Sequence, residues 1–219
     1  MKTSLFTVLA ASLIFCMGLL LPALGQESKP IQLPKPKLQS GKSLAQALKD
    51  RKTVKEYGPG KISDQRLANL LWAAWGINRP DSRRTAPSAL NKQEIDVYVA
   101  NAQGIYLYDA KGNALIPVVS GDNRSLTYTQ VDRFKDAPLH LVYVADLAKM
   151  ADGEEAHKMI LAAMDTGFIA QNAYLYCASD GLNTGFRVSI DKEKLGEAMK
   201  LKPSQRIMGA QSVGLPKRK

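Results

Sequence analysis

Residues 154–179 carry the longest helical pattern in the chain, and this segment constrains the fold more than any other. Mostly apolar or small side chains recur there three or four positions apart and form one stripe along the helix. The stripe comprises Ile160, Met164, Gly167, Phe168, Gln171, Tyr174, Leu175 and Ala178, and it is widened by Ala162, Ala163, Ala170 and Ala173. Because a helix that is apolar on most sides must be covered on most sides, we expect it in the core or between two subunits.

Strand patterns and shorter helices surround this segment. The strands that we expect are residues 95–100 and 105–109, joined as a hairpin, then 139–145 and 207–213. Shorter helices begin after the capping residues Ser43, Ser63 and Asp191. Residues 120–136 are polar without a clear period, which is typical of a lid or a surface excursion. Since strands and helices do not alternate strictly, the sequence predicts the α+β class, with a mixed or antiparallel sheet packed with helices.

The first 25 residues have the features of a secretory signal peptide. Lys2 precedes an apolar stretch, and the small residues Ala23 and Gly25 stand before a cleavage point at Gln26. We therefore expect an exported protein, periplasmic or secreted, that has no membrane contact after cleavage. Two alternatives stay open: the apolar stretch remains as a membrane anchor, or Cys16 carries a lipid, although the residues before it lack the small side chains of a lipoprotein signal.

Residues 26–40 are rich in Pro and Lys and predict an extended linker, so that residues 41–219 form one domain. The whole chain has a formal net charge of +10, and removal of Lys2 with the signal leaves +9. A basic balance favours nucleic acid, an acidic surface or an anionic cofactor as the partner. The basic residues are scattered and no nucleic-acid motif accompanies them, so we expect no nucleic-acid partner.

Two residues with chemistry of their own are expected in the core. Cys177 is the single cysteine after signal cleavage, and it lies in an apolar run. His140 lies inside the apolar segment 139–145. We expect neither to react, and we expect no metal site.

A basic segment is the first candidate for a binding site. It offers cations and a hydroxyl to an anion through Arg51, Lys52, Thr53 and Lys55. A phosphate monoester carries nearly two negative charges, and it needs new hydrogen-bond donors when it leaves water. Arginine suits a bidentate grip on phosphate oxygens, and lysine adds a point charge. A solvated basic loop is the alternative interpretation.

A turn at residues 87–91 is the second candidate. Its small side chains and the amide of Asn91 suit the edge of a planar heterocycle, because an amide both donates and accepts hydrogen bonds. A turn without a ligand is the alternative. Ser88 is not expected to act as a nucleophile, because no base stands in a recognisable motif with it.

These segments, with two others, resemble the motifs of the nitroreductase family of flavin mononucleotide (FMN) oxidoreductases. The family's Arg-Arg-Ser-x-Arg corresponds to Arg51-Lys52-Thr53-Val54-Lys55, and its Pro-Ser-Ser/Ala-x-Asn-x-Gln to Pro87-Ser88-Ala89-Leu90-Asn91-Lys92-Gln93. The other two matches are residues 167–172, running on to 179–182, and the tail at 213–217. The resemblance covers residues 41–219. One departure is Glu94-Ile95, where many members have Pro-Trp, and it would alter a pocket wall.

The resemblance implies FMN as the cofactor and a homodimer with two flavins at its interface. The basic segment would contact the phosphate and ribityl chain, as would Lys217 in the tail. The turn would face the flavin of the partner subunit, through Pro87, Ser88, Ala89 and Asn91. Backbone N–H groups near flavin N5 and O4 would come from Arg187, Val188 and Ser189. No catalytic side chain is implied, because the chemistry takes place at N5.

The implied reaction is a ping-pong transfer of two electrons. NAD(P)H or another reductant would reduce the flavin, and a small planar acceptor would then be reduced: a nitroaromatic, a quinone or an activated alkene. Two other classes stay open. One is a non-catalytic flavin-binding electron carrier, and the other is a basic module that binds acidic polymers.

Overall fold

An antiparallel sheet forms the centre of the protein. The computed structural model describes residues 29–39, 41–150 and 152–217, so the predicted signal peptide lies outside the described residues. Within them the sheet has seven strands in the order β1-β4-β3-β2-β5-β7-β6, and neighbouring strands pair antiparallel. The strands are β1 Ile31–Gln32, β2 Ile95–Asn101, β3 Gly104–Asp109, β4 Ala114–Ser120, β5 Leu139–Asp146, β6 Asn183–Arg187 and β7 Gln205–Gly214.

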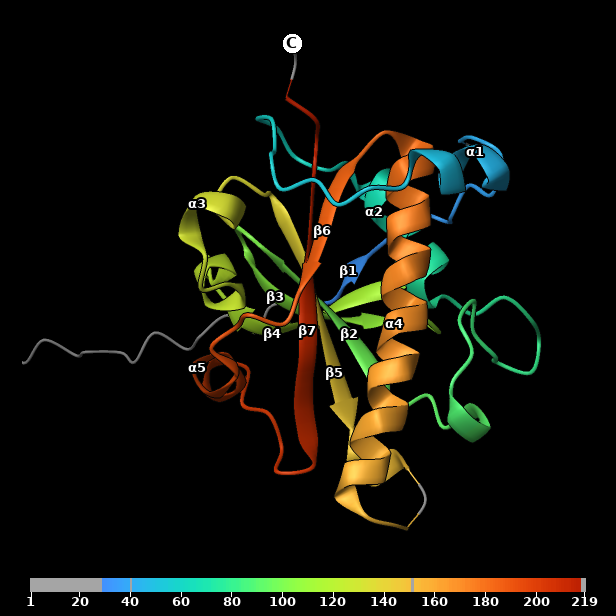
Figure 1. Cartoon of the computed structure of the whole chain (residues 1–219), viewed down its shortest axis with the longest axis vertical. Helices are drawn as coiled ribbons and strands as arrows, with labels where there is room; N and C mark the ends of the chain where they lie inside the picture. Colours follow the sequence, from blue (N-terminus) through green and yellow to red (C-terminus); the bar gives the residue numbers. More distant parts are fainter. Residues whose placement is uncertain (1–28, 40, 151, 218–219) are drawn as a thin grey trace, which may run out of the picture.

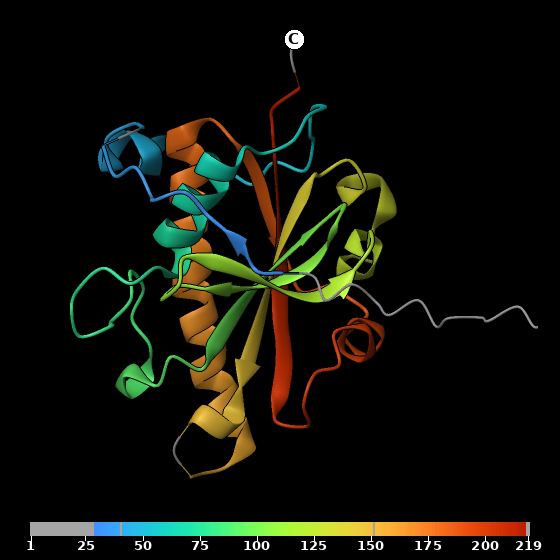
Figure 2. The ribbon, with the colours of Figure 1, turned by 180° about the vertical axis from the view of Figure 1, so that it is seen from behind.

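Helices cover both faces of this sheet (Figure 1). Described α-helices are α1 Leu44–Asp50, α2 Asp64–Trp75, α3 Val131–Phe134, α4 Glu155–Asp180 and α5 Lys192–Ala198, and the short 3-10 helices are η1 Ala89–Asn91, η2 Arg124–Thr127 and η3 Leu147–Lys149. Helices α1, α2 and α4 lie on one side of the sheet, and α3 and α5 lie on the other (Figures 1 and 2). In the described segments no helix has the length and apolar character that a membrane span requires. This architecture confirms the predicted α+β class.

Strand β5 shows how the pattern of side chains builds the two layers. Leu141 and Tyr143 belong to the cluster under α2 and α4, whereas Val142 and Val144 belong to the cluster that contains Leu195 of α5. Alternate side chains of a strand point to opposite faces, so a strand covered on both faces is apolar throughout. This confirms the core positions predicted for His140 and Cys177, which are fully buried. Burial raises the pKa of the Cys177 thiol to about 12, so the thiol stays protonated at neutral pH.

Helix α4 has two apolar faces that play different parts. Its inner face carries small side chains, among them Ala162, Ala170 and Ala173, and these are buried within the chain. The outer face carries much of the predicted stripe: Ile160, Met164 and Phe168 are 57%, 57% and 48% exposed. The N-terminal half of the stripe that the sequence singles out therefore does not pack on the chain's own sheet.

The predicted helix ends agree with the structure. Ser43, Ser63 and Asp191 each accept a hydrogen bond from a backbone N–H three residues on. Gly181 ends α4 in the left-handed conformation, with φ of 68°.

The sequence pattern does not predict three of the described strands: β1, β4 and β6. Ile31 and Gln32 pair with Leu115 and Ala114, and Leu33 is buried in the core, so part of the predicted linker is packed as the edge of the domain. Strand β4 contains Pro117, which is tolerated because the two-residue β1 leaves that part of β4 at the sheet edge. Strand β6 is a polar edge strand without alternation.

We predict that Leu70→Ala lowers the free energy of unfolding by about 2–5 kcal/mol, because Leu70 of α2 is fully buried and its removal leaves a cavity. Leu48→Ala is the matched control, since Leu48 of α1 is mostly exposed, and its effect should stay below about 1 kcal/mol. Urea unfolding of both variants measures the difference. Equal effects would contradict the packing of α2 against the sheet.

Candidate functional site

The basic segment lies beside the edge strand β6. Val54 donates its backbone N–H to the carbonyl of Thr184 at 2.9 Å. A Cβ added at Gly185 would lie 3.4 Å from Thr53 Cγ2 and 3.5 Å from Lys55 Cγ, so both side chains lie over this glycine. Lys52 and Val54 instead line a cavity of about 510 Å³ near the C-terminal end of α4. The structure thus brings the predicted segment together with β6 but separates Lys52 from Thr53 and Lys55.

Tyr174 of α4 organises the first part of this segment. Its hydroxyl accepts a hydrogen bond from Phe186 N at 2.8 Å and lies 3.0 Å from Thr53 Oγ1. The Arg51 guanidinium lies 5.5 Å from the centroid of the same ring. When Tyr174 donates its proton to Thr53, the threonine hydroxyl keeps its own proton for a ligand.

Arg187 is a buried cation at the end of β6, and its hydrogen bonds attach this end to neighbouring elements. Its side chain is 7% exposed, and it donates hydrogen bonds to Thr127 O and Oγ1, Ser212 Oγ and His140 Nδ1 at 2.7–3.0 Å. All of these acceptors are neutral, and within the described residues no carboxylate pairs with Arg187. Burial lowers the pKa of Arg187 to about 10, so it remains charged at neutral pH. His140 is held neutral: burial first, and then Arg187, place its pKa well below the ordinary value.

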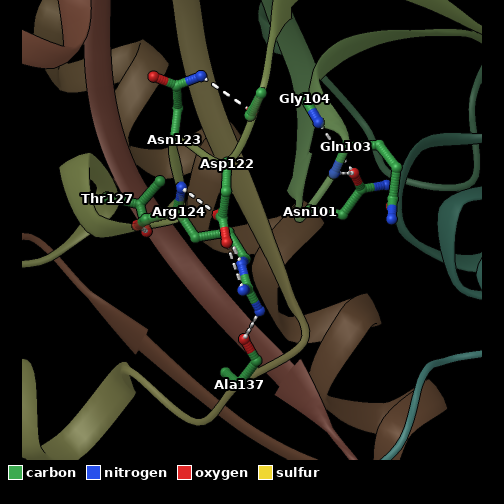
Figure 3. Close-up of polar contacts among 9 residues, drawn as sticks. Asn101, Gln103, Gly104, Asp122, Asn123, Arg124, Thr127 and Ala137 are labelled. Carbon is green, nitrogen blue, oxygen red and sulfur yellow. Dashed lines mark hydrogen bonds and ion pairs between the residues drawn. The ribbon is translucent and has the colours of Figure 1, made fainter.

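Phe134 links Arg187 to the basic segment. The centroid of its ring lies 4.2 Å from Arg187 Cζ and 5.6 Å from Lys55 Nζ, so both cations contact one aromatic ring. Phe134 belongs to the excursion predicted at residues 120–136, and this excursion is fixed rather than loose. Arg124 pairs with Asp122 at 2.6 Å and donates to Ala137 O at 3.2 Å (Figure 3).

The remaining predicted contacts near β6 lie at the surface. Val188 is exposed, and Ser189 O accepts hydrogen bonds from Thr129 N and Oγ1, both at 3.3 Å. Among the described residues, nothing accepts a hydrogen bond from the backbone N–H of Val188 or Ser189. Lys217 lines a second cavity, of about 950 Å³, that shares Gly181 and Pro216 with the cavity at Lys52.

The turn at residues 87–91 lies elsewhere on the same chain. Its Ala89 N donates to Asp165 Oδ2 at 2.8 Å, and Asp165 precedes Tyr174 by nine residues, or about 14 Å along α4. Figures 1 and 2 show α1 at one end of α4 and the loop of residues 76–93 beside its other half. Within one chain, the two predicted halves of the site therefore contact different parts of α4.

The turn is strained and points outward. Leu90 and Asn91 have φ of 50° and 55°, a conformation that is rare for residues other than glycine. Leu90 is also 85% exposed. Backbone strain of this kind persists where the surrounding structure imposes it, and it gathers at functional sites.

Glu94 stands where the sequence departs from the family motif, and the sequence predicts an altered pocket wall there but not the burial of its carboxyl. Its side chain is fully buried, and neither carboxyl oxygen has a hydrogen-bond partner among the residues that the structure describes. Burial, and after it the neighbouring Asp165, raise the pKa of Glu94 to about 7, against the smaller opposing effects of its own backbone and of Lys149. Because Asp165 holds the backbone of the turn, ionisation of Glu94 places a negative charge beside the residue that positions Ala89.

Comparison with known proteins identifies the class. A nitroreductase family model matches residues 48–215. A Ralstonia eutropha JMP134 structure classed as a nitroreductase is 37% identical, covers 90% of this chain and 94% of its own, and has a TM-score of 0.83. A protein of Methanocaldococcus jannaschii, also classed as a nitroreductase, is 24% identical over 170 residues, which cover 73% of this chain and 85% of that protein.

A structure from Desulfovibrio desulfuricans, solved with FMN, is 19% identical, has a TM-score of 0.60 and covers 82% of this chain and 89% of its own. At that identity it shows the fold alone. The fold and the family match together define an oxidoreductase. The chain belongs to the nitroreductase family, as its motifs predict.

We predict that Glu94→Gln removes a pH dependence of stability. A carboxyl whose folded pKa is about 7, against an ordinary 4.5, stabilises the fold at low pH and loses that contribution as pH rises between these values. The loss between pH 5 and pH 8 is on the order of 2 kcal/mol. Urea unfolding should therefore show the variant gaining stability over wild type at pH 8 and differing little at pH 5.

The exposed Glu193→Gln on α5 is the control and should leave the pH dependence unchanged. A wild-type protein equally stable at both pH values would contradict the burial of an ionisable Glu94.

Proposed function

We propose that the protein is an FMN-dependent oxidoreductase that transfers two electrons from NAD(P)H, or from another reductant, to a small planar acceptor such as a nitroaromatic, a quinone or an activated alkene. Membership of the family supports this proposal, as does the FMN held by the similarly folded Desulfovibrio desulfuricans protein. When bound, the flavin supplies the redox chemistry through its N5, and the chain supplies binding and orientation.

The single observation that carries the proposal is the set of uncompensated cations around β6 and the chain's tail. In the described part of the chain, no carboxylate forms an ion pair with any of them: Arg51, Lys52, Lys55 and Lys217. A group with two negative charges balances such a set, and hydrogen bonds to charged groups contribute about 1.5–3 kcal/mol each. The donor chemistry of these residues therefore fits a phosphate.

Each residue then has a definite part. Arg51 and Lys55 would hold the phosphate and ribityl oxygens, and Thr53 would donate the hydroxyl proton that Tyr174 leaves free. Phe134 keeps Lys55 and Arg187 in place without accepting a proton from either. The unpaired backbone N–H groups of Val188 and Ser189 are suited to negative charge that develops on a bound ring.

We propose that a second copy of the chain completes the site. The exposed stripe on α4 offers Ile160, Met164 and Phe168 to a partner, and the turn adds the nearly fully exposed Leu90. Covering these side chains removes apolar surface from water, which stabilises association. The turn at residues 87–91 would then reach the flavin of the partner subunit. Export through residues 1–25 remains part of the proposal, and outside the cytoplasm it favours a reductant other than NAD(P)H.

We predict that Arg51→Ala weakens FMN binding by roughly 10- to 100-fold, through loss of one charge-assisted contact of about 1.5–3 kcal/mol. The visible absorption of purified protein, titrated with FMN, measures this loss. Lys111→Ala is the control, because Lys111 lies exposed in the turn between β3 and β4. Turnover of a nitroaromatic with NADH or NADPH separates an enzyme from an electron carrier. A folded wild-type protein that stays colourless in excess FMN would refute the proposal.

A further inference from the structure

A second group of cations lies in the loop between α2 and η1. Arg79, Arg83 and Arg84 line a cavity of about 570 Å³ whose other walls come from residues 85–88, Leu90 and Asn91. Of the residues that the structure describes, no carboxylate lines this cavity. The nearby Asp81 pairs with Arg83 at 3.3 Å, and both of these side chains are more than half exposed. An exposed pair of this kind is weak, so the cavity keeps a positive potential.

Arg84 is the fixed member of the group. Its guanidinium lies 5.0 Å from the centroid of the Trp75 ring, and it donates to Trp75 O at 2.9 Å and to Gln93 Oε1 at 2.8 Å. These bonds use Nη1 and Nε, so Nη2 has no partner among the described residues. Arg79 lies beside it and donates to Arg84 O at 3.4 Å. One guanidinium is thus preorganised, and two exposed ones lie next to it.

The arginine loop and the turn form one rigid, strained unit. Gln93 connects them by donating to Ser82 O and Asn91 Oδ1, both at 3.1 Å. The described residues include six non-glycine positions with positive φ, and four lie in this unit: Ser82, Leu90, Asn91 and Gln93. Because such conformations are energetically unfavourable for residues other than glycine, their concentration here indicates a functional constraint on this loop.

We propose that this arginine cavity binds an anionic group, a phosphate or a carboxylate, on the small molecule that exchanges electrons with the flavin. The inference rests on the proposed function, because it is the turn at residues 87–91 that would bring the cavity to the partner's flavin. Guanidinium groups bind carboxylates and phosphates through paired hydrogen bonds. In the proposed dimer the basic segment would hold the phosphate end of the flavin, whereas the turn and the arginine cavity would lie at its ring, so the two groups of cations would serve different anions.

Arg79→Gln/Arg83→Gln is the informative variant, since both residues are exposed and Arg84 keeps its packing. Lys192→Gln/Lys194→Gln is the matched control: it removes two charges from α5 and, like the test variant, breaks one exposed ion pair. For acceptors, the probes are 4-nitrobenzoate and its neutral counterpart 4-nitrobenzamide. For reductants, they are NADPH and the uncharged 1-benzyl-1,4-dihydronicotinamide.

We predict that the arginine variant raises KM at least about 10-fold for one anionic probe, corresponding to about 1.4 kcal/mol of lost binding. KM for the two neutral probes should change less than twofold, as should FMN retention. A rise with 4-nitrobenzoate assigns the cavity to the acceptor, and a rise with NADPH assigns it to the reductant. Equal effects on charged and neutral probes, or a loss of FMN, would overturn the proposal.

A binding measurement needs no flavin. In Trp72→Phe protein, Trp75 is the single tryptophan, and it contacts Arg84. Inorganic pyrophosphate should change its fluorescence saturably, and the arginine variant should bind at least about 10-fold more weakly. Saturable, arginine-dependent binding by a protein that never takes up FMN would refute the proposed function but support the anion site. Fluorescence that does not respond, or that responds equally in both proteins, would refute the anion site.

Discussion

The packing of α4 governs the rest of the structure. Alanines on its inner face let the helix lie close on the sheet, while Ile160, Met164 and Phe168 remain exposed on the other side. The same helix separates the basic segment, which contacts it at Tyr174, from the turn, which contacts it at Asp165. The two predicted halves of the site therefore lie apart within a single chain, and the proposed dimer explains both the exposed stripe and this separation.

The basic segment and the turn also differ in the charged residues that surround them. Arg187 is a buried cation with neutral hydrogen-bond partners, and with Phe134 it fixes the excursion beside Lys55. Charges of both signs lie near the turn. The buried carboxyl of Asp165, with Glu94 as its neighbour, accepts a hydrogen bond from the turn, and other residues of the turn line the arginine cavity. Asp165 thus fixes the backbone of the turn, and the turn lies beside cations. This arrangement is suited to the recognition of an anionic substrate.

The sequence predicts the helices better than the strands and the site. Caps such as Ser63 and the long period of α4 are local signals, and both are correct in the structure. Strand β1 is short, β4 contains Pro117 and β6 is polar. All three therefore depend on sheet neighbours that are distant in sequence. The sequence marks Glu94 as a departure from the family motif but does not predict its burial beside Asp165, and it does not single out Arg84, because burial and packing on Trp75 depend on the tertiary structure. The family motifs locate the basic segment and the turn, but not their separation within one chain.

The central claim is that one site takes its basic segment from one chain and its turn from another. Arg51→Ala and Asn91→Ala chains, each with a different affinity tag, can be co-expressed and the heterodimer purified through both tags. Each parent homodimer should hold little FMN, whereas the heterodimer contains one site with both halves intact. The account predicts FMN absorption equal to about one flavin per two chains. A heterodimer no more coloured than its parents would show that the turn acts on its own chain, which contradicts the account.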